Sequence, residues 1–143
     1  MTETISELMM KDHVKINRML LNFDEAPKEK TETSLLFQEF KWNLEKHFFA
    51  EEKAIFAIMQ SIEGADIESV FQLMEEHGQI MTAIKNEEQS IKIGSHSDIS
   101  PLLEILKSHA KYEDNVFYPK LDEFLKEEQK KEMIKRIKSV VIY

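Results

Sequence analysis

The sequence of 143 residues contains no cysteine. This absence excludes disulfide bonds, zinc–thiolate sites, cysteine-ligated iron–sulfur clusters and thiol nucleophiles. Glycine and proline are rare, with three of each, and the glycine-rich phosphate-binding motifs of Rossmann-type and P-loop proteins are missing. No apolar run reaches the roughly 18 residues of a membrane-spanning helix, and no apolar signal segment is visible. We therefore expect a cytoplasmic protein with no membrane partner.

What is abundant is charge: 32% of the residues are charged and 42% are hydrophobic. With so few helix breakers, this composition favours long helices. Asp and Glu number 27 against 19 Lys and Arg, which gives a formal net charge of −8. A nucleic-acid-binding protein usually has a basic surplus or a basic stripe, so we expect no nucleic-acid partner.

Apolar periodicity predicts an all-α fold with four amphipathic helices, arranged as an up-down-up-down four-helix bundle. The expected helices cover about residues 4–23, 31–61, 67–88 and 100–117, with Gly64 and Asp66 as caps at the middle turn. Pro119 should end or kink the fourth helix. We expect one domain over residues 1–143, with a core of about 4–121 and a C-terminal helix of about 121–138.

An internal repeat is the most informative feature of the sequence. Asp12-His13 resembles Glu76-His77, and residues 47–52 (HFFAEE) resemble residues 109–114 (HAKYED). Each half of the chain therefore supplies one acid-His pair followed by one His-x-x-x-Glu motif. Acidic residues are so common here that one such motif means little, whereas two of them at matching places in a repeat are specific. Four of the five histidines occupy these positions, and His96 lies in an expected loop.

On a helical projection, each of the four histidines lies on the apolar face of its own helix. Glu51 and Glu113, four residues after His47 and His109, share that face. Carboxylates buried without partners would cost several kcal/mol each or would protonate. A bound pair of cations removes this conflict, and mixed imidazole and carboxylate ligands suit iron, manganese or zinc. The sequence therefore predicts a dinuclear metal site in the core of the bundle.

These motifs, with the following residues 116–119 (VFYP), resemble the hemerythrin-like, or HHE cation-binding, domains over about residues 8–121. The resemblance implies a left-handed four-helix bundle with an oxo- or hydroxo-bridged di-iron centre, so two iron ions are the expected cofactor. It also implies terminal histidine ligands and bridging glutamates, at His13, His47, His77, His109, Glu51 and Glu113.

One position departs from the oxygen carriers of this family, which have a second histidine four residues after the one on the third helix. Here that position is Met81. The carriers also space the last histidine and its carboxylate one residue further apart, which would select Asp114 as the bridge instead of Glu113. The chain is therefore more similar to the four-histidine, two-glutamate members of the family, which include iron sensors and proteins that repair iron centres. This sequence contains no cysteine-containing segment like the N-terminal one of the repair proteins, so we do not expect that particular activity.

We therefore expect a non-haem di-iron protein that binds O₂, peroxide or NO for sensing, storage or detoxification. Oxidase or peroxidase activity falls within this reading, although no organic substrate site is evident in the sequence. Two alternatives stay open, which are a reversible O₂ carrier of the same fold and a metal-free helical interaction module. Among the neighbouring residues, Tyr112 is a candidate hydrogen-bond partner of the site, Glu52 and Asp114 are candidate partners of the ligands, and Trp42 is a candidate contact residue.

Overall fold

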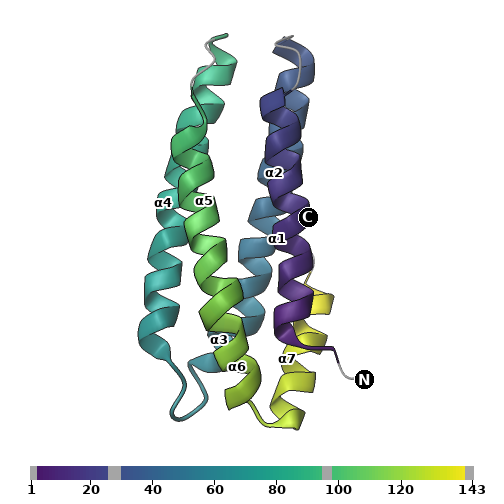
Figure 1. Ribbon diagram of the computed structural model, residues 1–143, viewed down its shortest axis with the longest axis vertical. Helices are drawn as coiled ribbons and strands as arrows, with labels where there is room; N and C mark the ends of the chain where they lie inside the picture. The colour runs from purple at the N-terminus through teal and green to yellow at the C-terminus, as the bar shows by residue number, and fades with distance from the viewer. Residues whose placement is uncertain (1–2, 26–29, 95–97, 141–143) are drawn as a thin grey trace.

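The structure is a computed structural model that describes residues 3–25, 30–94 and 98–140. Within these ranges every regular element is helical and no residue lies in a β-strand, which confirms the predicted all-α class. Long helices lie side by side along the long axis of the molecule (Figure 1), namely α1 (Ile5–Glu25), α2 (Lys30–Ala50), α4 (Ile67–Lys92) and α5 (Ser100–Tyr112). Helix α1 packs against α2, α2 against α4, and α4 against α5. No described helix combines the length and apolar character needed to cross a bilayer.

Two of the long helices continue through a π-helical turn. Helix α2 runs into η1 (Glu51–Phe56) and then α3 (Ala57–Met59), while α5 runs into η2 (Glu113–Phe117) and then α6 (Tyr118–Phe124). Pro119 lies in the first turn of α6, directly after the π-helical turn η2. The predicted interruption near residue 117 is therefore a change of helix type, and the chain does not leave its helical path.

The turn between α3 and α4 uses the expected caps. Gly64 adopts a positive φ of 84°, a conformation that residues with a Cβ rarely adopt. The Asp66 side chain accepts a hydrogen bond from the Ser69 backbone N–H at 3.1 Å and so caps the start of α4.

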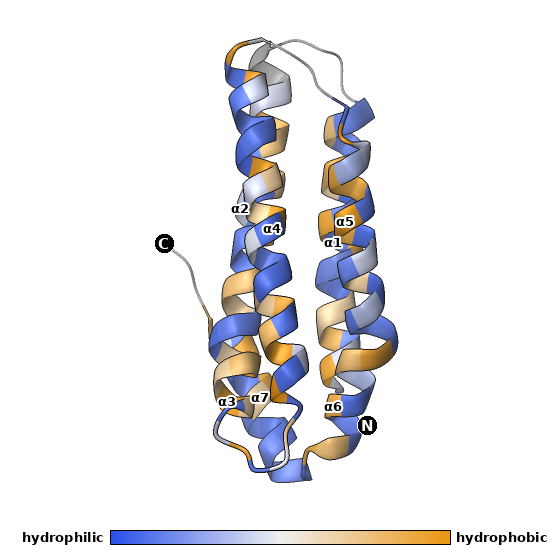
Figure 2. Cartoon of the chain, turned by 90° about the vertical axis from the view of Figure 1, so that its left-hand side faces the viewer, coloured by the Kyte–Doolittle hydropathy of each residue, from blue (hydrophilic) through white to orange (hydrophobic). Residues whose placement is uncertain are grey.

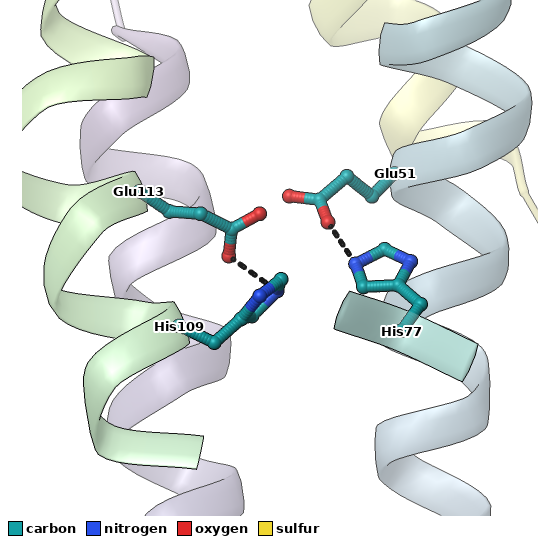
Figure 3. Close-up of side chains that lie close together, drawn as sticks. All are labelled: Glu51, His77, His109 and Glu113. Carbon is teal, nitrogen blue, oxygen red and sulfur yellow. Dashed lines mark ion pairs between the residues drawn. The ribbon is translucent and has the colours of Figure 1, made fainter. Parts of the chain in front are cut away.

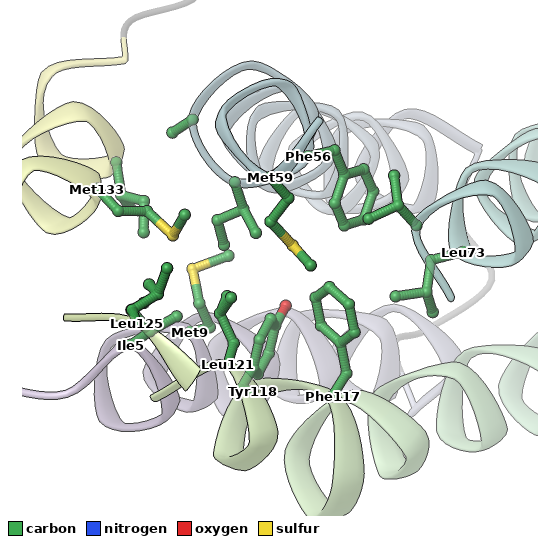
Figure 4. Packing of buried hydrophobic residues seen from close by; sticks show 14 residues of the cluster. Ile5, Met9, Phe56, Met59, Leu73, Phe117, Tyr118, Leu121, Leu125 and Met133 are labelled. Carbon is green, nitrogen blue, oxygen red and sulfur yellow. The ribbon is translucent and has the colours of Figure 1, made fainter. Parts of the chain in front are cut away.

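The C-terminal segment differs from the expected single helix over residues 121–138. Helix α6 ends at Phe124, the chain becomes extended at Leu125 and Lys126, and α7 (Glu127–Ser139) folds back against η1. The buried side chains of Leu125 and Met133 explain this break, because both contribute to the same apolar cluster and one straight helix would carry Met133 away from it (Figure 4).

The start of α1 is fixed by Asp122 of α6. Its carboxylate accepts hydrogen bonds from the backbone N–H groups of Ile5 and Ser6, at 2.9 and 3.0 Å, and from the Ser6 hydroxyl at 2.7 Å. These backbone groups have no partner within a helix, so a carboxylate from another element satisfies them. The contact holds α1 beside α6, and it therefore fixes α1 relative to the segment that carries Glu113.

The core consists of two apolar clusters separated by a polar layer. The lower cluster, at the α6–α7 end, has fourteen buried members: Ile5, Met9, Ala54, Ile55, Phe56, Met59, Val70, Leu73, Phe117, Tyr118, Leu121, Leu125, Met133 and Ile137. The upper cluster comprises Ile16, Leu20, Phe23, Phe37, Phe40, Leu44, Phe48, Ile80, Ile84, Ile91, Ile99 and Leu102. Figure 2 shows hydrophobic and hydrophilic residues alternating along each helix. On α1, for example, Met9 belongs to the lower cluster, Ile16 to the upper, and His13 lies between them.

Candidate metal centre

The polar layer contains all six side chains that the sequence analysis singled out. One histidine comes from each long helix and one glutamate from each π-helical turn, namely His13, His47, His77, His109, Glu51 and Glu113. They form two groups whose nitrogen or oxygen atoms lie within 4.8 Å of one another, one made of Glu51, His77, His109 and Glu113 and the other of His13, His47 and Glu113. Figure 3 shows the first group, whose side chains point toward one another from opposite sides of the bundle. Glu113 belongs to both groups.

The Nε2 atoms of the histidines face the glutamates. His77 Nε2 lies 2.8 Å from Glu51 Oε1, while His13 Nε2 and His109 Nε2 lie 3.1 and 3.4 Å from Glu113 Oε1. His13 Nε2 also lies 3.1 Å from Nε2 of His47. Two ring nitrogens at that distance share either a proton or a cation.

The Nδ1 atoms face outward, and each meets a carboxylate from a neighbouring helical segment. The four pairs are His47 with Asp12, His77 with Glu52, His109 with Glu76 and His13 with Asp114, at distances of 2.8 to 3.1 Å. A carboxylate on Nδ1 fixes the ring orientation and leaves the Nε2 lone pair free for a metal. We call these four acids the outer carboxylates. The acid of each acid-His pair serves the histidine of the next helix, because neighbouring residues on a helix point in different directions.

The π-helical turns lie at the two glutamates. Single π-helical turns are rare and occur frequently at functional sites. Each turn carries a buried glutamate on its first residue and returns the chain to α-helix within six residues. The two turns occupy equivalent places in the sequence repeat, so the local distortion is repeated together with the motif.

Tyr118 is a site residue that the sequence analysis missed. Its side chain is fully buried, and its phenol donates a hydrogen bond to Glu51 Oε2. Tyr112, the candidate named from the sequence, instead contacts the Ser69 hydroxyl at 2.9 Å. The π-helical turn explains the difference, because it places residue 118, five positions after Glu113, on the side of the glutamate. The aligned residue in the first half of the chain is Phe56, so this hydrogen bond makes the site asymmetric.

Burial and proximity shift the pKa values of the cluster. Burial, reinforced by the nearby Glu51 carboxylate, raises the pKa of Glu113 well above its ordinary value. Burial also lowers the pKa of His109. At His77 burial acts in the same direction, but Glu51 and Glu52 outweigh it and raise the pKa to about 9. The Tyr118 phenol, buried beside two carboxylates, has a pKa well above 10 and stays neutral.

The buried polar atoms of the cluster are arranged as a bound cation would require. Five of its buried atoms make no hydrogen bond within the described part of the chain: Glu51 Oε1, both carboxylate oxygens of Glu113, and Nε2 of His77 and His109. The 2.8 Å approach of His77 Nε2 to Glu51 Oε1 therefore lacks hydrogen-bond alignment. Buried polar atoms normally find partners, and these five converge on one point. Imidazole nitrogens and carboxylate oxygens without thiolates suit a first-row transition metal.

Other residues named from the sequence lie outside the cluster. Met81 packs at the edge of the upper cluster and offers no imidazole nitrogen. Asp114 and Glu52 contact histidine Nδ1 atoms, whereas Glu113 is fully buried between the histidines. Trp42 is 48% exposed on α2, with Lys46 over its ring. His96 lies outside the described residues.

Replacing Glu76 by glutamine should weaken metal binding by about 10- to 100-fold, because His109 loses the charged partner of its Nδ1 atom. Affinity is measured by competition with a chromophoric chelator. Glu75→Gln, one residue away on the exposed face of α4, removes the same charge and should leave the affinity unchanged. Equal affinities for the two variants would mean that the Glu76–His109 contact does not support metal binding.

Comparison with known proteins gives one finding for this chain. The model of the hemerythrin HHE cation-binding domain matches residues 4–121, which covers all six clustered residues and the four outer carboxylates. No curated protein and no solved structure matches the chain. The match covers most of the sequence, and the chain belongs to the hemerythrin HHE cation-binding domain family.

Proposed function

We propose that this protein is a single-domain, non-haem di-iron protein of up-down-up-down bundle topology. Its His/Glu-bridged iron pair binds O₂ or a related small ligand, peroxide or NO, for sensing, storage or detoxification. The observation that carries the proposal is the convergence of four histidine Nε2 atoms and two buried glutamates, with each histidine held from behind by an outer carboxylate. The family match, which is to a cation-binding domain, supports the same conclusion.

The two groups of ligand atoms differ in size, because one has four donor residues and the other has three. We infer that they bind their ions differently. His77, His109, Glu51 and Glu113 would hold one iron ion, and His13, His47 and Glu113 the other, with Glu113 shared. Two histidines and one carboxylate form the donor set of non-haem iron sites that leave positions open. We therefore assign the small ligand to the His13/His47 side. An iron pair supplies reversible electron transfer and binding of small oxygen or nitrogen ligands.

The protein's own residues orient and insulate such a pair. The outer carboxylates fix the four imidazole rings, and Tyr118 holds one oxygen of Glu51. Apolar clusters above and below shield the layer from water along the axis of the bundle. Met81 stands where the oxygen carriers have an additional histidine. The chain is therefore a weaker candidate for a reversible O₂ carrier. A metal-free interaction module does not account for the five buried atoms that make no hydrogen bond within the described residues.

The test is the metal content of untagged protein expressed with iron supplied, measured by elemental analysis. We expect about two iron atoms per chain and an absorption band in the near ultraviolet. Glu51→Ala combined with Glu113→Ala should lose both while the protein stays helical by circular dichroism. Folded wild-type protein without metal would overturn the proposal.

A further inference from the structure

A cavity of about 310 Å³ opens between α1 and α5 beside the cluster. Its inner wall includes the rings of His13 and His47, the two histidines of the three-donor group, together with His109. The remaining inner surface is largely apolar and includes Ile16, Leu44, Phe48, Leu106 and Ala110. Lys107 and Lys111, which follow each other by one turn of α5, line it toward the exposed face of that helix. We call this cavity the α1–α5 pocket.

The sequence repeat supplies an internal comparison. The equivalent position in the other half of the chain is a groove between α2 and α4, lined by Glu45, Phe48, Phe49, Glu52, Met74, His77, Gly78 and Met81. The residues aligned with Lys107, Ala110 and Lys111 are Glu45, Phe48 and Phe49. Among the clustered histidines, only His77 lines this groove. The two halves of the chain therefore form depressions at equivalent positions, but the residues that line them differ.

The difference at one aligned position explains why only one depression reaches several histidines. Phe48 stacks on the His77 ring, with ring centroids 3.8 Å apart, and so covers that histidine. Its counterpart in α5 is Ala110, which has no side chain beyond Cβ to cover His13. A phenylalanine at position 110 would cover the inner wall of the α1–α5 pocket at His13, just as Phe48 covers His77.

The two depressions also differ in the charged residues that line them. The protein carries a formal net charge of −8, yet the rim of the α1–α5 pocket carries two lysines where the α2–α4 groove has Glu45 and Phe49. Among the described residues, the one carboxylate that lines the pocket, Asp114, is paired with His13 Nδ1. Neither lysine forms an ion pair within the part of the chain that the structure describes. An adjoining groove that shares Val14 with the pocket is lined by three cationic residues and one acid, Lys11, Lys15, Arg18 and Glu39. A local positive potential on an acidic protein attracts anions.

The size of the pocket exceeds what a diatomic ligand needs. A volume of 310 Å³ has room for about ten water-sized groups, at roughly 30 Å³ each. Apolar walls favour an alkyl or aryl group, and the lysines favour a carboxylate at the rim. Size, polarity and charge together describe an amphipathic organic acid.

We propose that the α1–α5 pocket is a binding site for a monocarboxylic acid with an apolar chain of about six to eight carbons, whose carboxylate meets Lys107 and Lys111 and whose chain extends toward His13 and His47. The proposal deepens the proposed function, on which it rests, by naming a class of organic ligand that reaches the open side of the metal pair. It also makes Ala110 the residue that determines which half of the bundle receives the ligand.

The test is isothermal titration of iron-loaded protein with octanoate, with the uncharged octanol as a comparison. We expect one octanoate site per chain. Lys107→Gln with Lys111→Gln should weaken octanoate by about tenfold, the value of two exposed ion pairs, and leave octanol almost unchanged. Ala110→Phe, which copies Phe48, should abolish binding of both. Lys131→Gln with Lys135→Gln, two exposed lysines on α7, is the charge-matched control and should bind as the wild type does.

The outcomes separate this proposal from the proposed function, because metal content is measured on the same samples. Two iron atoms per chain with no octanoate binding would overturn the pocket and leave the metal proposal intact. Octanoate binding that follows the predicted pattern in protein without metal would overturn the metal proposal and leave the pocket as a ligand site. Binding that is equal in the Lys107/Lys111 and Lys131/Lys135 variants would show non-specific attraction and overturn the assignment. The two lysine pairs are exposed, so these variants keep the test valid even where Ala110→Phe does not fold.

Discussion

Replacing Glu113 by glutamine should stabilise the metal-free protein and destabilise the metal-loaded protein. Without metal, the Glu113 carboxylate is fully buried and neither oxygen has a hydrogen-bond partner in the described structure. Its raised pKa reflects the cost of keeping it charged there. A neutral amide of the same shape avoids that cost, and we expect a gain of about 1–3 kcal/mol in the free energy of unfolding near pH 8.

With metal bound, the same substitution should instead lower the free energy of unfolding, because Glu113 is shared by both groups of ligand atoms. A ligand that binds only the folded state stabilises it by about 4 kcal/mol at a thousandfold excess over its dissociation constant, and the variant loses much of this gain. The measurement is urea unfolding followed by circular dichroism, once with chelator and once with excess iron. Glu104→Gln, on the exposed face of the same helix, is the control and should change neither value. If Glu113→Gln destabilised both forms equally, Glu113 would have a packing role only.

The second large effect is a loss of stability of the metal-free protein as pH rises from about 6.5 to 9. The pKa of His77 is raised from 6.5 to about 9 in the folded state, because Glu51 and Glu52 outweigh the opposing effect of burial. The folded protein therefore keeps a proton that the unfolded chain releases. The stabilisation is complete below pH 6.5 and is lost by about pH 9, with an upper limit of about 3 kcal/mol.

Two other groups determine whether this slope is visible. The raised pKa of Glu113 also lowers the stability as pH rises, from its ordinary value of 4.5 up to its raised value in the folded protein. The lowered pKa of His109 acts in the opposite direction, but only below pH 6.5. Urea unfolding at a series of pH values in chelator should therefore show a monotonic fall, and His77→Gln should flatten most of it. Metal-loaded protein should show no such fall, because metal ligands must lose their protons to bind. A metal-free protein that became more stable between pH 6.5 and 9 would contradict these assignments.

Much of the fold could be predicted from the sequence because most of the helices are amphipathic and the turn before α4 carries recognisable caps at Gly64 and Asp66. The six clustered side chains could be found because they lie at matching positions of a repeat and on apolar helix faces. What the sequence could not show is which side chains of neighbouring helices meet. For that reason Asp12 and Glu76 were noted as parts of motifs, while their contacts with His47 and His109, on the following helices, became apparent only in the structure.

Tyr118 was missed for a different physical reason. A regular α-helix repeats nearly every four residues, and on that spacing Tyr112 appeared to be on the side of the site. The π-helical turn inserts one residue into the repeat and brings Tyr118 to Glu51 instead. Neither π-helical turn has a sequence signature of its own. The break at Leu125 was also missed, since only the packing of Met133 on the lower cluster shows that the chain must reverse.

The outer carboxylates form a closed circuit around the bundle. Asp12 links α1 to α2, Glu52 links η1 to α4, Glu76 links α4 to α5, and Asp114 links η2 back to α1. The Asp12 and Glu76 links each lie within one half of the chain, whereas the Glu52 and Asp114 links join the two halves. One half alone therefore has a single link and cannot orient the cluster. Two identical halves around a two-fold axis would close the same circuit, but both of their faces would then be alike. Because the two halves are parts of one chain and not identical copies, Ala110 can differ from Phe48, and Tyr118 from Phe56. The covalent continuity of the chain therefore allows the two faces of this nearly symmetric centre to be chemically different.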